Sequence, residues 1–267
     1  MRLINPGFYI FEDEFDPKKI KRVERAARLC YKSDLNDDPE SFLKDKCDRG
    51  HTSVIEHEKI TVYIVCDRGV SHEIVRHRIG ASYSQESTRY CNYCKDKFGN
   101  QVTYINIPDS FMPNGTNEDY PTLTAKQFWL NGLRCNEEDY QTMVGYGATP
   151  QIARSLLDNA LKTEIAITYN FRSWRNFFLL RTAKGAHPQM RQLAIPLLKV
   201  FQHYFPCFFG DIKYEELPEE VQMNTWNYIA KDDEDLDKFI AEFIMGEKGN
   251  VLSKYIPESE LDKYIAK

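Results

Sequence analysis

Two segments rich in β-branched residues most constrain what this chain can fold into. Lys59–Cys66 (KITVYIVC) concentrates valine, isoleucine and threonine, and Thr163–Tyr169 (TEIAITY) alternates apolar and polar residues. Both patterns are typical of β-strands, because branched side chains pack well on a pleated surface. Leu3–Phe11 and Gln101–Ile107 are two further predicted strands. Four strands are therefore expected, with helical segments between them.

Helices are predicted between and after these strands. Asp16-Pro17, Asp38-Pro39 and Thr149-Pro150 are typical helix starts, in which a capping side chain precedes a proline at the first helical position. Phe128 is expected to be a buried residue of one helix. Apolar residues at helical spacing predict further helices at Val70–Arg78, Ala125–Tyr146, Asn170–Arg181 and His187–Tyr204.

The composition is that of a globular protein with a small negative charge. Its 267 residues suit one large domain or two small ones. The net charge of −5 argues against a surface that coats nucleic acid, and fits a local basic pocket for a small anion. No apolar run reaches the ~18 residues of a membrane span, and the N-terminus turns acidic too early for a signal peptide. Seven scattered cysteines indicate reduced thiols, so we expect a cytoplasmic protein that binds neither a membrane nor a nucleic acid polymer.

The composition changes after Asp211. Residues 213–267 are acidic and contain two predicted helical pieces, Leu236–Phe243 and Glu258–Ile265. No residue pattern in this segment points to chemistry. We therefore predict a main domain over residues 1–212, followed by a helical C-terminal extension over residues 213–267 that packs on the core or on a neighbouring subunit.

Arg76–Tyr90 (RHRIGASYSQESTRY) is the stretch predicted to bind a ligand. It holds three arginines and several hydroxyl side chains, with Glu86 as its only acid. Guanidinium groups match phosphate and carboxylate, and hydroxyls with loop N–H groups around Gly80 can complete an anion cradle. We expect a loop that holds a phosphorylated ligand. The alternative is a solvated loop whose arginines pair with acids elsewhere.

Three more arginines lie outside this stretch. Arg154 is predicted on a helix, and Arg172 and Arg181 flank an aromatic helical segment that contains Trp174 and Phe177. Arginines at the edge of an apolar wall suit a planar ring ligand. Alternatively, their long stems only cover apolar surface.

Other catalytic patterns find less support. His51, Glu56 and His57 lack the H-E-x-x-H spacing, and Cys91–Cys94 is a C-x-x-C without the second pair of a structural zinc site. Ser87 lacks the G-x-S-x-G context of a nucleophile, so a hydroxyl that binds ligand is the preferred interpretation. The glycine-rich dinucleotide and P-loop motifs are missing as well. No metal site is therefore expected.

The Arg76–Tyr90 stretch resembles the signature of the flavin-dependent thymidylate synthases. That signature runs Arg-His-Arg, seven residues, Ser, and shortly afterwards Arg-Tyr. Here eight residues separate Arg76-His77-Arg78 from Ser87, and Arg89-Tyr90 follows. The additional residue is assigned to Gly80 or its neighbour. Other blocks similar to the family follow in its order, at Arg25–Arg28, Gly50–His57, Ile152–Arg154 and Asn170–Arg181.

The resemblance implies a fold and a reaction. The implied fold is α/β (α+β), a mixed β-sheet flanked by helices, with residues 1–212 as the catalytic domain. The implied enzyme is a methyltransferase that converts dUMP to dTMP. It uses 5,10-methylenetetrahydrofolate as carbon donor and NADPH as reductant through bound FAD. Members of the family are homotetramers whose active sites lie between subunits.

The resemblance also implies the site residues. Arg181 is the expected catalytic residue, which polarises the uracil ring. Glu73 stands where the family usually has glutamine, and Gln85 where it often has glutamate. The residues expected to bind the flavin are Ser53, Arg76, His77, Arg78, Gln85, Asn170, Arg172 and Asn176, with His51 near flavin and folate. The residues expected to bind the nucleotide are Glu73, Arg76, Gln85, Glu86, Ser87, Thr88, Arg89, Arg154 and Arg181.

Two hypotheses from other classes stay open at this point. The first is a non-catalytic module that binds nucleotide or phosphate through the arginine stretch; it would bind dUMP and be colourless. The second is a zinc hydrolase that uses His51, His57, Cys91 and Cys94; active protein free of metal would exclude it.

Overall fold

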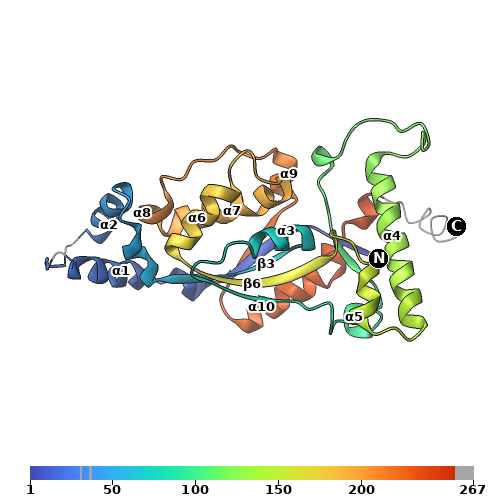
Figure 1. Cartoon of the computed structure of the whole chain (residues 1–267), viewed down its shortest axis with the longest axis horizontal. Helices are drawn as coiled ribbons and strands as arrows, with labels where there is room; N and C mark the ends of the chain where they lie inside the picture. Colours follow the sequence, from blue (N-terminus) through green and yellow to red (C-terminus); the bar gives the residue numbers. More distant parts are fainter. Residues whose placement is uncertain (31, 36–37, 256–267) are drawn as a thin grey trace.

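A mixed five-stranded sheet forms the centre of the molecule (Figure 1). The computed structural model describes the whole chain except residues 31, 36–37 and 256–267. In the described part the strand order is β4-β6-β3-β2-β7, antiparallel except for the pair β2–β7. The strands are Ala81–Gln85 (β4), Lys162–Asn170 (β6), Lys59–Asp67 (β3), Gly7–Phe11 (β2) and Trp226–Ala230 (β7). A separate parallel pair joins β1 (Arg2–Ile4) to β5 (Thr103–Ile105).

β3 and β6 form the longest pairing of the sheet. Each strand has nine residues, and they pair over their whole length from Lys59 opposite Asn170 onward. Every second residue of β6 is buried, so Ile165, Ile167 and Tyr169 face the core. The two strands predicted from the β-branched segments are therefore confirmed.

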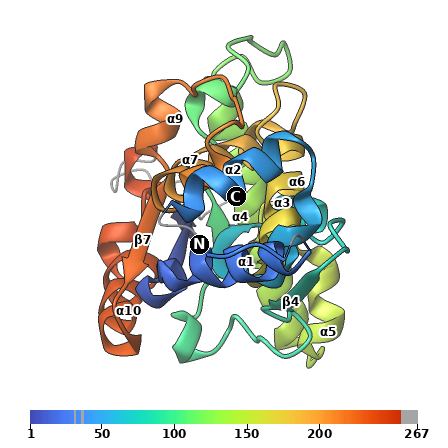
Figure 2. The same ribbon diagram turned by 90° about the vertical axis from the view of Figure 1, so that its left-hand side faces the viewer.

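Helices cover one face of the sheet and extend past its end (Figures 1 and 2). Their aromatic side chains Trp174, Phe178 and Phe201 are fully buried against the sheet. Asp38 accepts a hydrogen bond from the Ser41 N–H at 3.0 Å, which confirms the helix start predicted at Asp38-Pro39. These helices are α1 (Lys18–Leu29), α2 (Pro39–Asp48), α3 (Arg68–Ile74), α6 (Phe171–Arg181), α7 (Pro188–Tyr204) and α8 (Pro206–Phe209).

The opposite end of the molecule is formed by α4 (Ala125–Gly145) and α5 (Pro150–Ala153) with the β1–β5 pair (Figure 1). Leu130 and Leu133 are buried there, but Phe128 is 51% exposed, so its predicted burial is wrong. Phe128 lies on the outer side of α4, where it contacts Tyr120 instead of the core. Within the described residues, no helix is both long and apolar enough to cross a membrane. Together the layers confirm the predicted α/β fold, a mixed sheet flanked by helices.

The predicted strand over Leu3–Phe11 is divided into β1 and β2 at Asn5-Pro6. Proline has no N–H group for a strand ladder. The chain therefore leaves one pairing and enters another, because β1 pairs with β5 whereas β2 pairs with β3.

The stretch Arg76–Tyr90, predicted as a loop, contains the edge strand β4. Tyr83 and Gln85 are partly buried, whereas Ser82 and Ser84, which alternate with them along the strand, are exposed. The loop prediction is wrong for this part because small polar residues at the outward positions hid the two-residue period. An edge strand tolerates such polarity, since one of its sides meets solvent.

The C-terminal segment contributes a strand as well as helices. β7 lies beside β2, so close that a Cβ atom at Gly7 would be 2.1 Å from the Trp226 ring. Helices α9 (Glu219–Met223) and α10 (Asp233–Phe239) flank β7, and a π-helical turn at Ile240–Ile244 continues α10. The helical piece predicted at 236–243 agrees with this, while the piece predicted at 258–265 lies outside the described residues. A purely helical extension is wrong, because the run WNYIA has the aromatic and branched residues of a strand.

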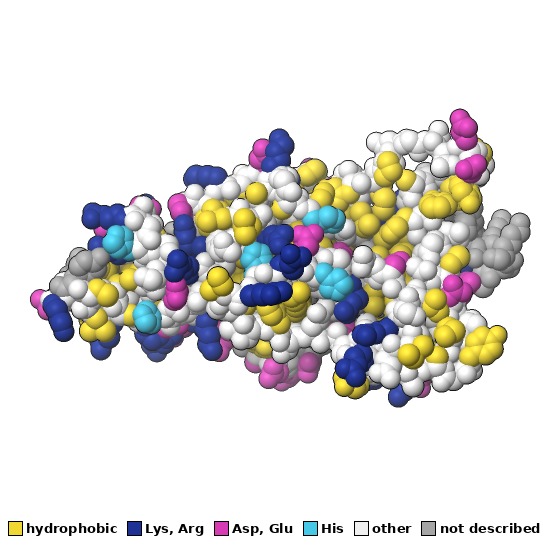
Figure 3. Space-filling view, viewed as in Figure 1, with side chains coloured by type: hydrophobic (Ala, Val, Ile, Leu, Met, Phe, Trp, Pro, Cys, Tyr) yellow, Lys and Arg dark blue, Asp and Glu magenta, His cyan; other side chains and the backbone are white. Residues whose placement is uncertain are grey.

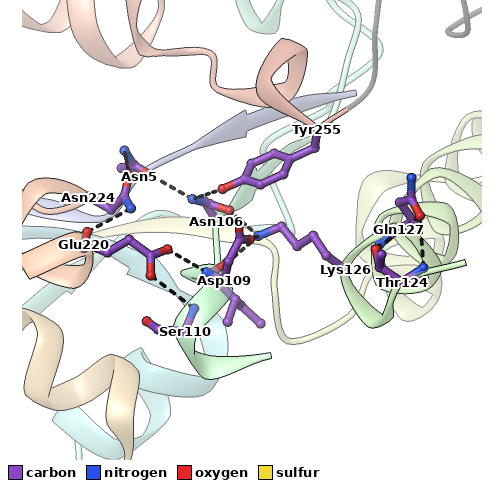
Figure 4. Close-up of polar contacts among 11 residues, drawn as sticks. Asn5, Asn106, Asp109, Ser110, Thr124, Lys126, Gln127, Glu220, Asn224 and Tyr255 are labelled. Atoms are coloured by element: carbon purple, nitrogen blue, oxygen red, sulfur yellow. Dashed lines mark hydrogen bonds and ion pairs between the residues drawn. The ribbon is translucent and has the colours of Figure 1, made fainter. Parts of the chain in front are cut away.

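A polar network joins α4, the N-terminal region and the C-terminal segment (Figure 4). The Lys126 ammonium donates to Asn106 Oδ1 at 2.6 Å, and Asn106 Nδ2 donates to Asn5 Oδ1 at 2.9 Å. Glu220 Oε1 accepts from the backbone N–H of Asp109 at 2.9 Å. Burial lowers the pKa of Lys126 to about 8, although Asp109 at 3.5 Å opposes this. The network thus ties segments that are distant in sequence to one another.

Candidate active site

Arg181, at the end of α6, is held by three hydrogen bonds. Its Nε donates to His77 Nε2 at 2.9 Å, Nη1 donates to Glu73 Oε2 at 2.8 Å, and Nη2 donates to the Glu73 carbonyl oxygen at 3.0 Å. Glu73 belongs to α3, which ends at Ile74, earlier than the predicted helix over Val70–Arg78. A guanidinium has five N–H donors. Since these contacts use three, one donor on each Nη atom is left for a ligand.

His77 is neutral in this arrangement. Burial and the adjacent Arg181 charge lower its pKa to about 4. Its Nε2 accepts from Arg181, so the ring proton is on Nδ1. The imidazole packs against Phe177, with ring centroids 5.2 Å apart. His77 therefore orients the guanidinium without adding a second positive charge.

Two tyrosines fasten this corner to the sheet. The hydroxyls of Tyr83 and Tyr169 are 2.7 Å apart, and the single proton of the Tyr83 hydroxyl is directed to the His77 carbonyl oxygen, with the Ile74 carbonyl oxygen 3.1 Å away. Burial is the largest cause that raises the pKa of Tyr169. Neither tyrosine was among the site residues predicted from sequence. The signal that could have found them is a tyrosine at a core-facing strand position, since a buried hydroxyl needs a partner.

Gly80 lies against the first turn of α6. Its φ of +63° is the left-handed region that favours glycine, and a Cβ atom there would be 2.5 Å from Asn170 Nδ2. Asn170 caps α6 by accepting from the Ser173 N–H at 2.8 Å, and Ser173 Oγ donates to the Ile79 carbonyl at 2.6 Å. Gly80 therefore forms a tight bend that is fixed to the start of α6.

Arg76 and Arg78, on either side of His77, are exposed. Within the described part of the chain, neither forms an ion pair with an acid. On the face shown in Figure 3, basic side chains and histidines gather over the middle of the molecule, where Figure 1 places α3 and β6. These two guanidinium groups are therefore available to an anionic ligand, in contrast to the solvated-loop alternative in which arginines pair with acids.

Residues 51–57 lie next to α6 and form a short 3₁₀ helix at Thr52–His57. Glu56 Oε1 accepts from Arg172 Nη1 at 2.5 Å, which brings this turn to the first turn of α6. His51 and Ser53 in this segment are exposed, and so is Asn176 in α6. The structure thus places most residues predicted to bind flavin around the start of α6.

A second group surrounds Thr88. Arg154 Nη1 donates to Thr88 Oγ1 at 3.1 Å, although the two residues are 66 positions apart. The Arg89 backbone N–H donates to Ser87 Oγ at 3.4 Å, and the Arg89 guanidinium lies 5.5 Å from the Tyr90 ring centroid. Arg154 therefore lies beside the segment Ser87–Arg89, and the guanidinium and hydroxyl groups of these residues are of the kind that binds a phosphate.

Gln85 and Glu86 point away from these two groups. Gln85 Nε2 donates to Ser71 Oγ at 2.9 Å and to Thr163 Oγ1 at 3.0 Å, so the amide braces β4 against its neighbours. Glu86 Oε2 accepts from Lys162 Nζ at 2.9 Å. The side chains of both residues are therefore occupied by contacts within the chain.

The residues considered for metal or thiol chemistry do not assemble into such a site. Within the described residues, no three His, Cys, Asp or Glu side chains are placed to hold a metal ion. Cys91 and Cys94 are both free thiols, and burial is the main cause that raises the pKa of each. Neither is thus an activated thiolate.

The donor set fits a flavin dinucleotide. The exposed Arg76 and Arg78 supply charge for two phosphates, and the capped start of α6 supplies polar groups at Asn170 and Arg172. The aromatic residues Phe171, Trp174, Phe177 and Phe178 of α6 are buried, so the polar positions of the helix are the ones available to such a ligand. The chemistry of these residues is therefore compatible with the group that the sequence resemblance implies.

Comparison with known proteins identifies the family. A family model described as thymidylate synthase complementing protein matches residues 14–207, which include Arg181 and the whole arginine stretch. Similar proteins include flavin-dependent thymidylate synthases from three bacteria. The relative from Geobacter sulfurreducens is 34% identical over 205 residues, covering 73% of this chain and 82% of the relative. The relative from Corynebacterium efficiens is 31% identical over 229 residues (78% and 85%), and that from Mycobacterium tuberculosis is 30% identical over 217 residues (76% and 83%).

The matched range begins before α1 and ends within α8, so it contains β4, β6 and β3 of the central sheet with their covering helices, but neither β2 nor β7. Every residue of the candidate site lies within it. The chain therefore belongs to the thymidylate synthase complementing protein family.

Proposed function

We propose that this protein is a flavin-dependent thymidylate synthase, a methyltransferase that reductively methylates dUMP to dTMP. In this proposal 5,10-methylenetetrahydrofolate donates the carbon and NADPH reduces bound FAD. The observation that supports it best is the Arg181 corner, where three contacts fix a guanidinium and leave two N–H donors open. Such a fork suits a carbonyl oxygen on which negative charge develops.

The nucleotide would use both polar groups of the site. Ser87, Thr88, Arg89 and Arg154 would hold the phosphate, since a dianion requires several charge-assisted donors. Arg181 would donate to the uracil ring and stabilise the negative charge that develops on the ring during the reaction. Glu73 would act on Arg181 rather than on the nucleotide. Gln85 and Glu86 would reach the nucleotide only through their backbone, because their side chains are already bonded.

The flavin would be held around the start of α6. Ser53, Arg76, Arg78, Asn170, Arg172 and Asn176 would supply polar contacts, with His51 at the edge near the folate. Bound flavin would supply the hydride that completes the methyl group. The chain itself then needs no nucleophile, which agrees with the raised pKa values of Cys91 and Cys94. Its own task is to orient the two rings and exclude water.

The proposal includes a cytoplasmic homotetramer with active sites between subunits. Ile79 is 88% exposed and Tyr90 is 77% exposed, and both adjoin residues assigned to ligands. Large apolar side chains on a surface favour contact with another protein. We assign residues 1–212 to the catalytic domain and 213–267 to an extension that adds β7 to its sheet.

Two measurements on purified protein test the proposal. The protein should be yellow, with the absorption bands of an oxidised flavin, and should release tritium from [5-³H]dUMP when NADPH and the folate are both present. Omitting either reagent should abolish the release. Colourless protein that binds dUMP without turnover would instead support the non-catalytic binding module.

A further inference from the structure

A cavity lies on the face of the central sheet that is not covered by the helix carrying Arg181. Its volume is about 510 Å³, within the usual range for small-molecule sites. Glu164 and Ala166 of β6 line it, whereas Ile165 and Ile167, which alternate with them, face the helices. Arg181, Ser87, Arg89 and Arg154 do not line it. Gln85 and Glu86 do line it, so the cavity adjoins the segment assigned to the substrate phosphate but lies apart from Arg181 and Arg154.

The floor of this cavity is a single row of residues across four strands. Tyr9 of β2 lies opposite Tyr63 of β3, Tyr63 opposite Ala166 of β6, and Ala166 opposite Ser84 of β4. The row changes from two large rings to two very small side chains. A trough therefore exists above Ala166 and Ser84, since neither side chain is long enough to fill it.

The two tyrosines form the side wall of the trough. Their rings are parallel within 5°, with centroids 4.6 Å apart. Because they stack across neighbouring strands, the second face of the Tyr63 ring is directed along the row, toward Ala166. A planar ring placed above Ala166 would continue this stack. Stacking of a base on an aromatic side chain is a common source of nucleotide affinity.

Charged groups lie at the edge of the same trough. Lys162 donates to Glu86 Oε2 at 2.9 Å and lies 3.6 Å from Glu164 Oε2, while Glu164 Oε1 accepts from the Tyr9 hydroxyl at 2.8 Å. An ammonium has three N–H donors, so one is left beyond these two carboxylates. A donor beside carboxylate oxygens can pair with a heterocycle edge that carries both C=O and N–H groups.

The entrance adds positive charge. Lys97 lies in the lining in addition to Lys162, which is already paired with Glu86 and Glu164. Lys97 is exposed at this entrance, on the segment that follows the arginine stretch. An anionic group on the ligand would be favoured there.

Part of the cavity is built from segments outside the family match. Arg2 and Tyr9 precede residue 14, and Ile244 and Met245 follow residue 207. The turn at Ile240–Ile244 reaches this position because β7 carries the C-terminal segment onto the sheet. The cavity is therefore a property of this chain's own termini as well as of the shared domain.

We propose that this cavity binds a planar heterocyclic anion of the size of a nucleoside monophosphate, separately from the substrates of the proposed reaction. The ring stacks on Tyr63 above Ala166, its polar edge meets the remaining donor of Lys162, and its anionic group lies toward Lys97. Glu86 directly precedes Ser87, so the ligand adjoins the segment assigned to the substrate phosphate.

Isothermal titration of the full-length protein with AMP, GMP, CMP and dTMP tests this, each with dUMP at saturation to fill the catalytic site. At least one should bind. Ser84→Phe, which fills the trough from an exposed position, should weaken binding about tenfold or more, as loss of a stacking partner does. Ser82→Phe is the matched control, since Ser82 lies on the same strand face but does not line the cavity; its affinity should match wild type.

Ala166→Phe fills the same trough from β6 and provides a second variant if Ser84→Phe fails to fold. Binding by none of the four nucleotides would overturn the proposal. The proposal would also be overturned if Ser82→Phe and Ser84→Phe weakened binding equally. The same holds if Arg181→Ala abolished nucleotide binding while the cavity variants did not weaken it. If dUMP itself does not bind, the proposed function fails, whereas titration without dUMP still decides the cavity.

Discussion

The two faces of the central sheet surround a partly buried cation with different partners. On the helical face, Arg181 contacts one carboxylate and a neutral histidine, and keeps two N–H donors open. On the other face, Lys162 is enclosed by Glu86 and Glu164. Burial alone would lower the pKa of Lys162, but the two carboxylates raise it above its ordinary value.

The difference separates a group arranged for a ligand from one that is mainly satisfied within the chain. A cation with spare donors can stabilise charge that arrives during a reaction. A cation between two carboxylates instead holds strands and segments together, and removal of it leaves buried charges uncompensated. Mutation of the two should thus change different quantities, activity in one case and stability in the other.

The largest expected effect is on turnover. Arg181→Ala should lower kcat by a factor on the order of 10² to 10³, as expected for loss of a donor that stabilises transition-state charge. The flavin absorption spectrum should be unchanged. Arg175→Ala is the matched control, because Arg175 lies on the same helix but pairs with Asp211 at 2.6 Å. Steady-state kinetics that show equal losses for both variants would remove Arg181 from the mechanism.

Lys162→Met should mainly reduce stability. It leaves Glu86 and Glu164 facing each other without their shared cation, so the free energy of unfolding should fall by about 3 kcal/mol. Lys44→Met removes an exposed partner of Asp48 and should leave the denaturation midpoint unchanged. Urea denaturation measures both. A midpoint for Lys162→Met equal to that of wild type would contradict the structural role assigned to this lysine.

Glu73 is expected to act through Arg181. Glu73→Ala should lower kcat roughly tenfold, since a hydrogen bond to a charged group contributes about 1.5 kcal/mol or more. Glu73→Gln keeps an oxygen acceptor and should recover most of the rate. KM for dUMP should change little in either variant. If KM rises while kcat is unchanged, Glu73 binds the nucleotide directly instead of positioning the arginine.

The smallest expected effect concerns Lys126, a buried lysine that donates to the oxygens of Asn106 and Ile107 and pairs with one carboxylate, Asp109, at 3.5 Å. Its pKa is about 8 in the folded protein, below the ordinary lysine value of 10.5 that applies to the unfolded chain. Above pH 8 the unfolded chain therefore binds more protons than the native one, so stability rises with pH. Relative to Lys126→Met, wild type should gain about 1 kcal/mol between pH 8 and 9. Urea denaturation at both pH values measures this, and a difference that is constant with pH would contradict the lowered pKa.

The predictions from sequence succeeded where the signal is local. The branched residues of β3 and β6 and the cap at Asp38 act within a few positions, so their patterns identified the elements. They failed where a segment's environment matters more than its own composition. β4 is polar yet pairs with β6, and the acidic C-terminal segment contains β7 because β2 offers it an unpaired edge.

For the site, the sequence by itself determined which residue types are available: the arginine stretch, Arg154, Arg181 and their hydroxyl neighbours. Only the tertiary structure decided their partners, because strand register and helix packing set which side chains meet across more than 60 positions, as with Arg154 and Thr88. The contact of Glu73 with Arg181, 108 positions away, is one that only the packing of α3 against α6 creates. Glu86 lies one position from Ser87, but the pairing of β4 with β6 brings its side chain to Lys162, a partner 76 positions away.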